Sequence, residues 1–152
     1  MVTERQDFMT VAYECAVKGY EEGGLPIGAV LVRDGQILAR GHNQRVQKSD
    51  PIAHGEMACL RAAGRQRTYR DTVLYTTLAP CMMCTGTIIQ FKIPKVVVGE
   101  SVNFPGNKKL LADFGVEVID LNDRRCIALM EKFIREKPDL WNEDIAEDQD
   151  VL

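Results

Sequence analysis

Residues 26–39 read PIGAVLVRDGQILA, and the rest of the chain has to be arranged around this stretch. A run of apolar residues rich in β-branched side chains, 27–32, is followed by Asp34-Gly35 and by a second apolar run, 37–39. An Asp-Gly pair between two such runs is the strongest short signal for a β-hairpin. The stretch therefore predicts two antiparallel strands joined by a tight turn.

Helical and extended patterns alternate on both sides of this hairpin. Apolar residues recur at helical spacing from Phe8 to Gly19, and Gly23-Gly24 indicates the end of that helix. Further along, the patterns predict helices at 54–63, 81–91, 108–114 and 122–137, strands at 72–78, 95–98 and 116–121, and a loop at 99–107. Strands separated by helices run parallel, so we expect a three-layer α/β/α fold around a mixed five-stranded sheet. No repeat or linker divides the chain, which predicts a single domain over residues 1–152.

Composition and charge narrow the class of protein. The chain has 152 residues, 45% of them hydrophobic, and 19 Lys and Arg against 22 Asp and Glu give a net charge of 19 − 22 = −3. These values exclude a disordered or fibrous protein. No apolar run approaches the roughly 18 residues of a membrane span, and the first residues lack a signal-peptide pattern, so we expect a cytoplasmic protein. The acidic balance disfavours a nucleic-acid partner, and a cluster of arginines is interpreted as a solvated helix end and loop: Arg61, Arg65, Arg67 and Arg70.

The five cysteines do not fit a disulfide framework, because their number is odd and no export signal is present. Cys15 and Cys126 lie in helical apolar patterns and are interpreted as core thiols. Cys81 and Cys84 form a Cys-x-x-Cys pair that suits a metal or a redox role, although the Met-Met between them is unlike the thioredoxin arrangement. Cys59 is a further candidate ligand, and as a fourth ligand it would make a bound zinc ion structural. It lies five residues after His54, however, so its side chain is expected on another part of the helix surface.

Two short motifs lie at the starts of two predicted helices, His54-Gly55-Glu56 and Pro80-Cys81-Met82-Met83-Cys84. One imidazole and two thiolates suit tetrahedral zinc with a fourth place left for water, which is the pattern of a catalytic site. Cys81 stands where the helix dipole favours a thiolate. The other histidine, His42, is interpreted as a hydrogen-bonded structural residue.

Glu56 adds a proton carrier to this site. Residues two apart do not share a face of a regular helix, so His54 and Glu56 converge only if they occupy an irregular first turn, which Gly55 permits. A carboxylate beside zinc-bound water can accept its proton and pass it to a substrate. Zinc lowers the pKa of such water to about 7.

The combination of H-x-E with P-C-x-x-C resembles the signature of the zinc-dependent cytidine and nucleobase deaminase superfamily. Nearly the whole chain is similar to the fungal-type free-base cytosine deaminases. The segments that carry this likeness are 20–24 with 26–28, 41–43, 74–78, 98–100 with 102–104, and Trp141 with 143–145.

This resemblance implies a cytidine deaminase-like fold, one Zn²⁺ per chain and a homodimer, with helix 81–91 as a candidate for the subunit contact. It implies roles for ten residues: His54, Cys81 and Cys84 as zinc ligands, Glu56 as the proton shuttle, and Asn43, Gly55, Asp144, Phe104, Trp141 and Ile27 as substrate-binding residues. The segment from about 138 to 152 would act as a lid over the pocket.

The implied reaction is the hydrolysis of cytosine to uracil and ammonia, a step of pyrimidine salvage. Three departures from the fungal pattern are expected near the pocket: Met82 in place of an acidic residue, Ala79 in place of a serine, and Asn142 in place of an aromatic residue. These departures leave other substrates open. One class is another small amino-heterocycle, such as isocytosine, 5-methylcytosine, creatinine, guanine or a pterin, and the other is an adenosine in tRNA. A zinc-stabilised binding module without catalytic activity is the alternative from another class.

Overall fold

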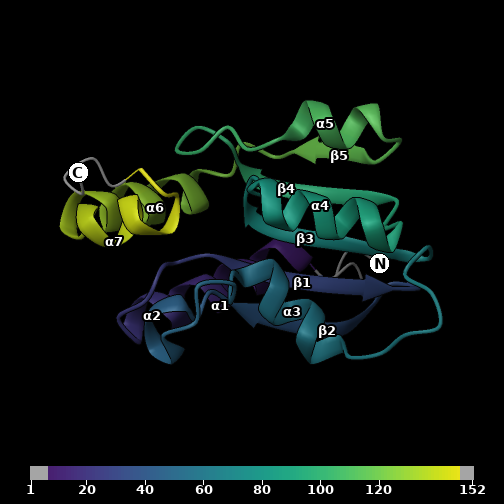
Figure 1. The fold of residues 1–152 in the computed structure, drawn as a ribbon, viewed down its shortest axis with the longest axis horizontal. Helices are drawn as coiled ribbons and strands as arrows, with labels where there is room; N and C mark the ends of the chain where they lie inside the picture. Colours follow the sequence, from purple (N-terminus) through teal and green to yellow (C-terminus); the bar gives the residue numbers. More distant parts are fainter. Residues whose placement is uncertain (1–6, 148–152) are drawn as a thin grey trace.

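The computed structural model describes residues 7–147 and contains one five-stranded sheet in the order β2-β1-β3-β4-β5 (Figure 1). The strands are β1 (Gly28–Arg33), β2 (Gln36–His42), β3 (Thr72–Leu78), β4 (Lys95–Glu100) and β5 (Glu117–Asp120). β1 pairs antiparallel with β2 and β3, whereas β4 pairs parallel with β3 and β5. The predicted hairpin and mixed sheet are confirmed.

Helices cover both faces of this sheet. They are α1 (Phe8–Glu21), α2 (Arg45–Lys48), α3 (Gly55–Ala63), α4 (Met82–Phe91), α5 (Lys108–Asp113), α6 (Arg124–Glu136) and α7 (Pro138–Asp144). Helix α1 and the start of α6 pack on one face, and α3, α4 and α5 pack on the other. Figure 1 shows α6 and α7 side by side at one end of the molecule. The three-layer prediction is therefore confirmed.

Apolar side chains from the sheet and the helices fill three clusters. On the α1 face, Ala12 and Cys126 pack against the strand residues Val30 and Val97. On the opposite face the cluster is larger and includes Leu31, Cys59, Leu74, Ile88, Val96 and Leu111. A third cluster, with Leu25, Ile27, Leu78, Met130, Phe133 and Trp141, lies where α6 and α7 meet the end of the sheet. Burial of apolar surface contributes about 25 cal/mol per Å², so these clusters supply most of the driving force for the fold.

Two glycines allow helices to approach the hairpin closely. A Cβ atom on Gly28 would lie 2.1 Å from the carbonyl oxygen of Ala12 in α1. A Cβ atom on Gly41 would lie 2.6 Å from the backbone nitrogen of Cys59 in α3. Both distances are far inside van der Waals contact, so only glycine fits at these positions.

The structure differs from the sequence predictions in several places. Strand β4 continues to Glu100, so the loop expected from residue 99 begins after it. Helices α2 and α7 were not predicted. Pro138, which directly follows the predicted helix 122–137, is the first residue of α7, a position where a proline is tolerated because its N–H is not needed. The apolar residues of helix 81–91 favour burial on more than one side, but α4 leaves Met82 60% and Phe91 39% exposed.

Among residues 7–147, none of the helices is both long enough and apolar enough to span a membrane.

Candidate active site

The site is built on the first residues of α3 and α4, which begin beside each other at one end of the sheet. His54 is the N-cap of α3 and Cys81 is the N-cap of α4, and both have extended backbone, with φ −66°, ψ 162° and φ −71°, ψ 178°. Neither side chain caps its helix, so the imidazole and the thiol are free to face each other. The irregular first turn expected for His54 and Glu56 is therefore present.

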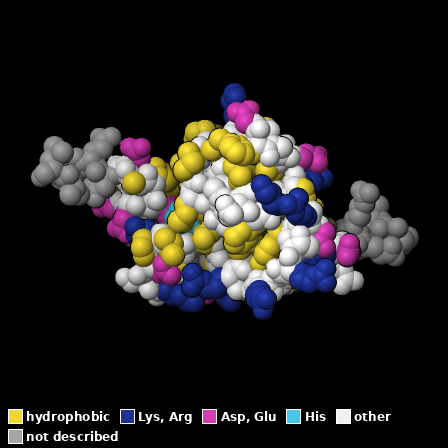
Figure 2. Space-filling model, turned by 45° about the vertical axis from the view of Figure 1, so that its right-hand side comes forward, with side chains coloured by type: hydrophobic (Ala, Val, Ile, Leu, Met, Phe, Trp, Pro, Cys, Tyr) yellow, Lys and Arg dark blue, Asp and Glu magenta, His cyan; other side chains and the backbone are white. Residues whose placement is uncertain are grey.

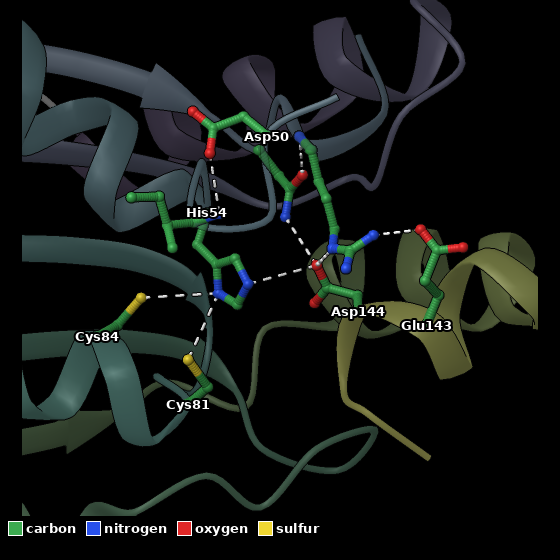
Figure 3. A network of polar contacts seen from close by, with 9 residues as sticks. Asp50, His54, Cys81, Cys84, Glu143 and Asp144 are labelled. Atoms are coloured by element: carbon green, nitrogen blue, oxygen red, sulfur yellow. Dashed lines mark hydrogen bonds and ion pairs between the residues drawn. The ribbon is translucent and has the colours of Figure 1, made fainter. Parts of the chain in front are cut away.

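The three predicted metal ligands converge. Nδ1 of His54 lies 3.4 Å from Sγ of Cys81 and 3.8 Å from Sγ of Cys84, and the three donor atoms all lie within 4.8 Å of one another (Figure 3). Tetrahedral zinc, with a Zn–N distance near 2.0 Å and a Zn–S distance near 2.3 Å, requires an N···S separation of about 3.6 Å. The two observed N···S distances bracket that value, so the donor set fits one zinc ion.

The pKa values of the three candidate ligands also indicate a cation site. The hydrogen bond from Cys84, with that from His54, lowers the pKa of Cys81 to about 4 despite burial. Burial opposes the charge on His54, but the contacts with Cys81 and Asp144 raise its pKa to about 9. The pKa of Cys84 is raised, by its hydrogen bond to Cys81 and by burial. The cluster thus already holds a thiolate beside positive charge, the arrangement in which a dication replaces protons.

Glu56 is the buried carboxyl of the site, with only 4% of its surface exposed. It lies against Cys84 and lines the same pocket as His54 and Cys81. Burial, with the nearby charge of Cys81, raises its pKa to about 7. A carboxyl with such a pKa can both accept and release a proton at neutral pH.

Asp144 joins helix α7 to the metal ligands. Its Oδ1 atom lies 3.5 Å from Nε2 of His54, accepts a hydrogen bond of 3.4 Å from Nδ2 of Asn43 and lies 3.9 Å from Nε of Arg45 (Figure 3). A carboxylate on the far nitrogen of a ligand histidine fixes its ring and its tautomer. Burial raises the pKa of Asp144, while the charge of His54 opposes that rise.

A small pocket opens onto these groups. It encloses about 280 Å³, part of it open to solvent, and is lined by Ile27, His54, Glu56, Leu78, Ala79, Cys81, Phe104, Trp141, Asp144 and Ile145. The rings of Phe104 and Trp141 meet edge to face with their centroids 6.1 Å apart. Aromatic and aliphatic walls around a few polar groups suit a small flat ring.

The remaining two predicted substrate residues lie at the margin of this pocket. Asn43 is fully buried, and its Oδ1 atom accepts a hydrogen bond of 2.9 Å from the backbone nitrogen of Arg45. A Cβ atom on Gly55 would lie 2.8 Å from the carbonyl oxygen of Ile27, so this position requires glycine. All ten residues named from the sequence thus lie in or beside one site, and their contacts with a substrate stay predictions.

One of the three residues expected near the pocket lines it, and one important residue was missed. Met82 and Asn142 do not line the pocket, whereas Ala79 does. Met82 points outward because it occupies the first turn of α4, on the side away from Cys84. Arg45 pairs with both Glu143 and Asp144, and no local pattern signals a contact between residues about a hundred positions apart.

The other titratable candidates have structural roles. Nε2 of His42 lies 2.9 Å from Oε1 of Glu22, as the structural interpretation predicted. Cys59 is fully buried, with its Sγ atom 3.5 Å from the carbonyl oxygen of Ala39, and is not part of the ligand group. It does not close the site as a fourth ligand, so the fourth place of the metal is left to water or substrate.

Comparison with known sequences gives one family and two kinds of relative. Residues 2–100 match the family described as the cytidine and deoxycytidylate deaminase zinc-binding region. The chain is 54% identical to a cytosine deaminase of Candida albicans, over 91% of this chain and 95% of the relative. It is 40% identical to a tRNA-specific adenosine deaminase of Streptococcus pyogenes, over 64% of each chain.

Solved structures share the fold. One from a study of A-to-I editing by tRNA:A34 deaminases has a TM-score of 0.66 and 30% identity, covering 77% of this chain and 98% of the other. NE0047, solved in complex with 2,6-diaminopurine, has a TM-score of 0.73 and 22% identity, covering 83% of this chain and 79% of the other. At that identity the second likeness concerns the fold alone.

Proposed function

Since this chain belongs to the family of zinc-binding cytidine and deoxycytidylate deaminases, we propose that it converts free cytosine and water into uracil and ammonia. The observation that carries the proposal is the convergence of His54, Cys81 and Cys84 beside the buried carboxyl of Glu56. The similarity to the Candida albicans cytosine deaminase, which extends well beyond the zinc-binding region, supports a free base as substrate.

In this proposal His54, Cys81 and Cys84 hold one zinc ion per chain. When bound, zinc supplies a Lewis acid that makes hydroxide available near neutral pH. Cys59 supplies no fourth donor, so the site has three protein ligands. Three ligands support a catalytic zinc site, and this disfavours a non-catalytic module in which zinc is purely structural.

Glu56 moves the protons of the reaction. Its carboxylate accepts a proton from the attacking water, and the new C–O bond forms at C4, the ring carbon that bears the amino group. The carboxyl gives that proton to N3 of the ring, then accepts the remaining proton of the hydroxyl group added at C4 and gives it to the amino group. The C–N bond breaks, ammonia leaves and uracil remains, so Glu56 ends in the state in which it began.

The pocket walls hold the base in place. Phe104 and Trp141 enclose the ring above the floor formed by Ile27, and stacking on such rings is worth roughly 1 to 3 kcal/mol per base. The amide of Asn43, the backbone N–H of Gly55 and the carboxylate of Asp144 supply the polar contacts. In this proposal residues 1–152 form one deaminase domain and 138–152 its lid, of which 148–152 lie outside the described residues.

Deamination of adenosine in tRNA is the second candidate, supported by the likeness to the Streptococcus pyogenes enzyme. The closure of the pocket by Trp141 and Asp144 of α7 favours a small free base over a nucleotide within a chain. Other small amino-heterocycles require the same chemistry and differ only in how they fit against Ala79 and the aromatic walls.

The test is to count zinc per chain and to measure ammonia release from free bases, nucleosides and a tRNA anticodon stem. We expect one zinc ion and turnover of cytosine, with no release from cytidine or tRNA. Cys81→Ala should lose both zinc and activity, whereas the matched variant Cys59→Ala should keep both. Zinc-loaded protein that is inactive on all substrates would contradict an enzymatic function, and activity on tRNA alone would select the second candidate.

Three further features belong to this proposal. A homodimer is supported by the exposed apolar side chains of α4, Met82 and Phe91. A cytoplasmic location is supported by five free cysteines, two of which must stay reduced to bind zinc. A role in pyrimidine salvage follows from the product, since uracil is the free base that such a route would consume.

A further inference from the structure

A second, wider hollow lies on the far side of the segment that carries Asn43 and His54. It encloses about 990 Å³, including space open to solvent. Its walls come from α1, β2, the α2 region and α3, and the lining residues are Cys15, Lys18, Arg40, Gly41, His42, Gln44, Lys48, Asp50, Ala53, Ala58, Arg61 and Ala62. It shares no lining residue with the pocket of the candidate active site.

Close backbone packing holds the walls of this hollow in place. A Cβ atom on Gly19 of α1 would lie 3.1 Å from Cδ2 of His42, and one on Gly41 would lie 2.6 Å from the backbone of α3. Within residues 7–147, β2 pairs with β1 alone, so its outer edge is left without a neighbouring strand. The hollow is therefore a preformed feature beside the edge strand of the sheet.

Positive charge from four separate elements gathers around it. Lys18, Arg40, Lys48 and Arg61 are all exposed, and none forms an ion pair with another described residue. Figure 2 shows Lys and Arg side chains along the lower margin of the molecule, the end that carries β2 and α3 in Figure 1. Such a concentration is unusual in a chain with a net charge of −3.

Few acidic groups balance these cations. Asp50 is the one acidic residue among the lining residues, and its Oδ1 atom accepts a hydrogen bond of 3.0 Å from the backbone nitrogen of Ile52 (Figure 3). Glu14 lies near Cys15 on α1 but does not line the hollow. By contrast, Arg33, Arg45 and Arg125 all have acidic partners. The four cations around the hollow thus keep their positive charge uncompensated by ion pairs with other described residues.

We propose that the hollow binds a small ligand with two or more adjacent phosphate groups, such as a nucleoside di- or triphosphate. Four cations on different walls match the three or four negative charges of adjacent phosphate groups better than the smaller charge of a single phosphate. The small side chains of Cys15, Ala53, Ala58 and Ala62 leave a wall on which an uncharged flat group can rest. The part of the hollow that a ligand can occupy, about 420 Å³, is within the range of small-molecule sites.

The wall of the hollow continues directly into the candidate active site. His42 precedes Asn43, and Ala53 precedes His54, so each wall residue is followed by a residue of the site. Gln47 donates hydrogen bonds both to Glu22, the partner of His42, and to the carbonyl oxygen of Asn43. The ligand would lie back to back with the substrate, separated by one layer of chain.

Calorimetric titration of the zinc-loaded protein with ATP, inorganic triphosphate and adenosine tests this site. The proposal expects ATP and triphosphate to bind and adenosine not to bind. The double variant Arg40→Gln with Arg61→Gln should raise the Kd for both ATP and triphosphate at least about tenfold, because two charge-assisted contacts are lost. The matched pair Arg65→Gln with Arg67→Gln, in the exposed loop after α3, removes the same charge elsewhere and should change Kd by less than about twofold.

Cys15 supplies a second readout inside the hollow. It is half-buried, whereas Cys59, Cys84 and Cys126 are buried and Cys81 is a candidate zinc ligand. Bound triphosphate should therefore slow alkylation of Cys15 by iodoacetamide several-fold, with zinc content unchanged.

These readouts also separate the sources of the phosphate. ATP binding more tightly than triphosphate identifies a nucleotide as the ligand, and equal affinity identifies polyphosphate itself. No binding, binding that both double variants weaken equally, or binding that leaves Cys15 reactivity unchanged would overturn the proposal. The charges would then serve only to keep the exposed edge of β2 from pairing with other chains.

Discussion

At the scale of single residues, the metal site depends on where two helices begin. His54 and Cys81 have extended backbone and so lie outside the regular helices that follow them. This backbone turns both side chains toward the same point, while Cys84, one turn into α4, completes the set. A regular helix at either position would have pointed the ligand away.

Glu56→Gln separates metal binding from proton transfer. The change keeps the shape of a buried side chain but removes its ability to accept a proton, so we expect one zinc ion per chain and turnover lowered by at least about 10²-fold to 10⁴-fold. Zinc stoichiometry and steady-state ammonia release measure the two effects. Glu117→Gln, at the exposed first residue of β5, is the control and should match the unchanged protein. An active Glu56→Gln variant would remove Glu56 from the mechanism.

The sequence was sufficient for the ligands because their spacing reflects local structure. The residue types and the two helix starts could be recognised within segments of three to five residues, His54 to Glu56 and Pro80 to Cys84. Arg45 could not be found in this way, since its partners in α7 approach it only in the folded chain. The exposure of Met82 could not be found either, because it depends on which elements pack around α4 and no local pattern indicates this.

At the scale of elements, helix starts are stabilised by acidic caps that share one arginine. Asp7 caps α1 by accepting from the backbone nitrogen of Thr10, and Asp123 caps α6 by accepting from that of Arg125. The guanidinium of Arg125 lies 2.8 Å from Asp123 and 3.8 Å from Asp7. Its hydrogen bond lowers the pKa of Asp123, and the hydrogen bond from Thr10 lowers that of Asp7.

Asp123→Asn should remove a pH-dependent part of the stability. Because the folded pKa of Asp123 is lowered, its contribution is present above the unfolded value of about 3.9 and is lost as pH falls through the folded value. Asn caps a helix as well as Asp, so only the charge is lost. We expect the variant to be less stable by about 0.5 to 1 kcal/mol at pH 6 and equal to the unchanged protein near pH 2.

Urea unfolding at several pH values measures that difference. Any release of zinc at low pH affects both proteins alike and cancels. Asp113→Asn, at the exposed pair with Lys109, is the control and should shift the free energy of unfolding little at any pH. A difference that does not shrink as the pH falls from 6 toward 2 would show that the lost interaction is not one of charge.

Helix α7 acts on the site through Trp141, while its neighbour Leu140 serves packing. Both side chains belong to the cluster at the end of the sheet, but only Trp141 lines the pocket. We expect Trp141→Ala to lower kcat/KM for the free base about 10-fold to 100-fold through lost stacking, with zinc retained. Removal of residues 138–152 should abolish activity on the free base. The control Leu140→Ala should lower the melting temperature but leave kcat/KM unchanged. If Leu140→Ala and Trp141→Ala lowered kcat/KM equally, α7 would contribute only to stability.

At the scale of the whole molecule, the layered fold could be predicted because hairpin turn chemistry and alternating patterns determine strand direction. The sequence did not indicate which helix faces stay uncovered, since apolar side chains look the same whether they face the sheet or another chain. Figure 2 shows apolar side chains spread over one face of the molecule with most charged ones at its margins. Exposed large apolar residues on α4 are typical of an interface between chains.

Met82 is the residue that tests this interface, because it is 60% exposed on α4 and does not line the substrate pocket. Two chains of 17.0 kDa give a dimer of about 34 kDa, which sedimentation equilibrium distinguishes from the monomer. We expect the unchanged protein to be dimeric and Met82→Lys to raise the dissociation constant at least about tenfold, because a charge is then buried in an apolar contact. Leu121→Lys places the same charge on an exposed apolar position after β5 and should leave the dimer intact. Zinc content must stay at one per chain in both variants, since Met82 follows the ligand Cys81. If the unchanged protein is a monomer, there is no such contact. If the dimer survives Met82→Lys but not Leu121→Lys, the contact lies elsewhere than on α4.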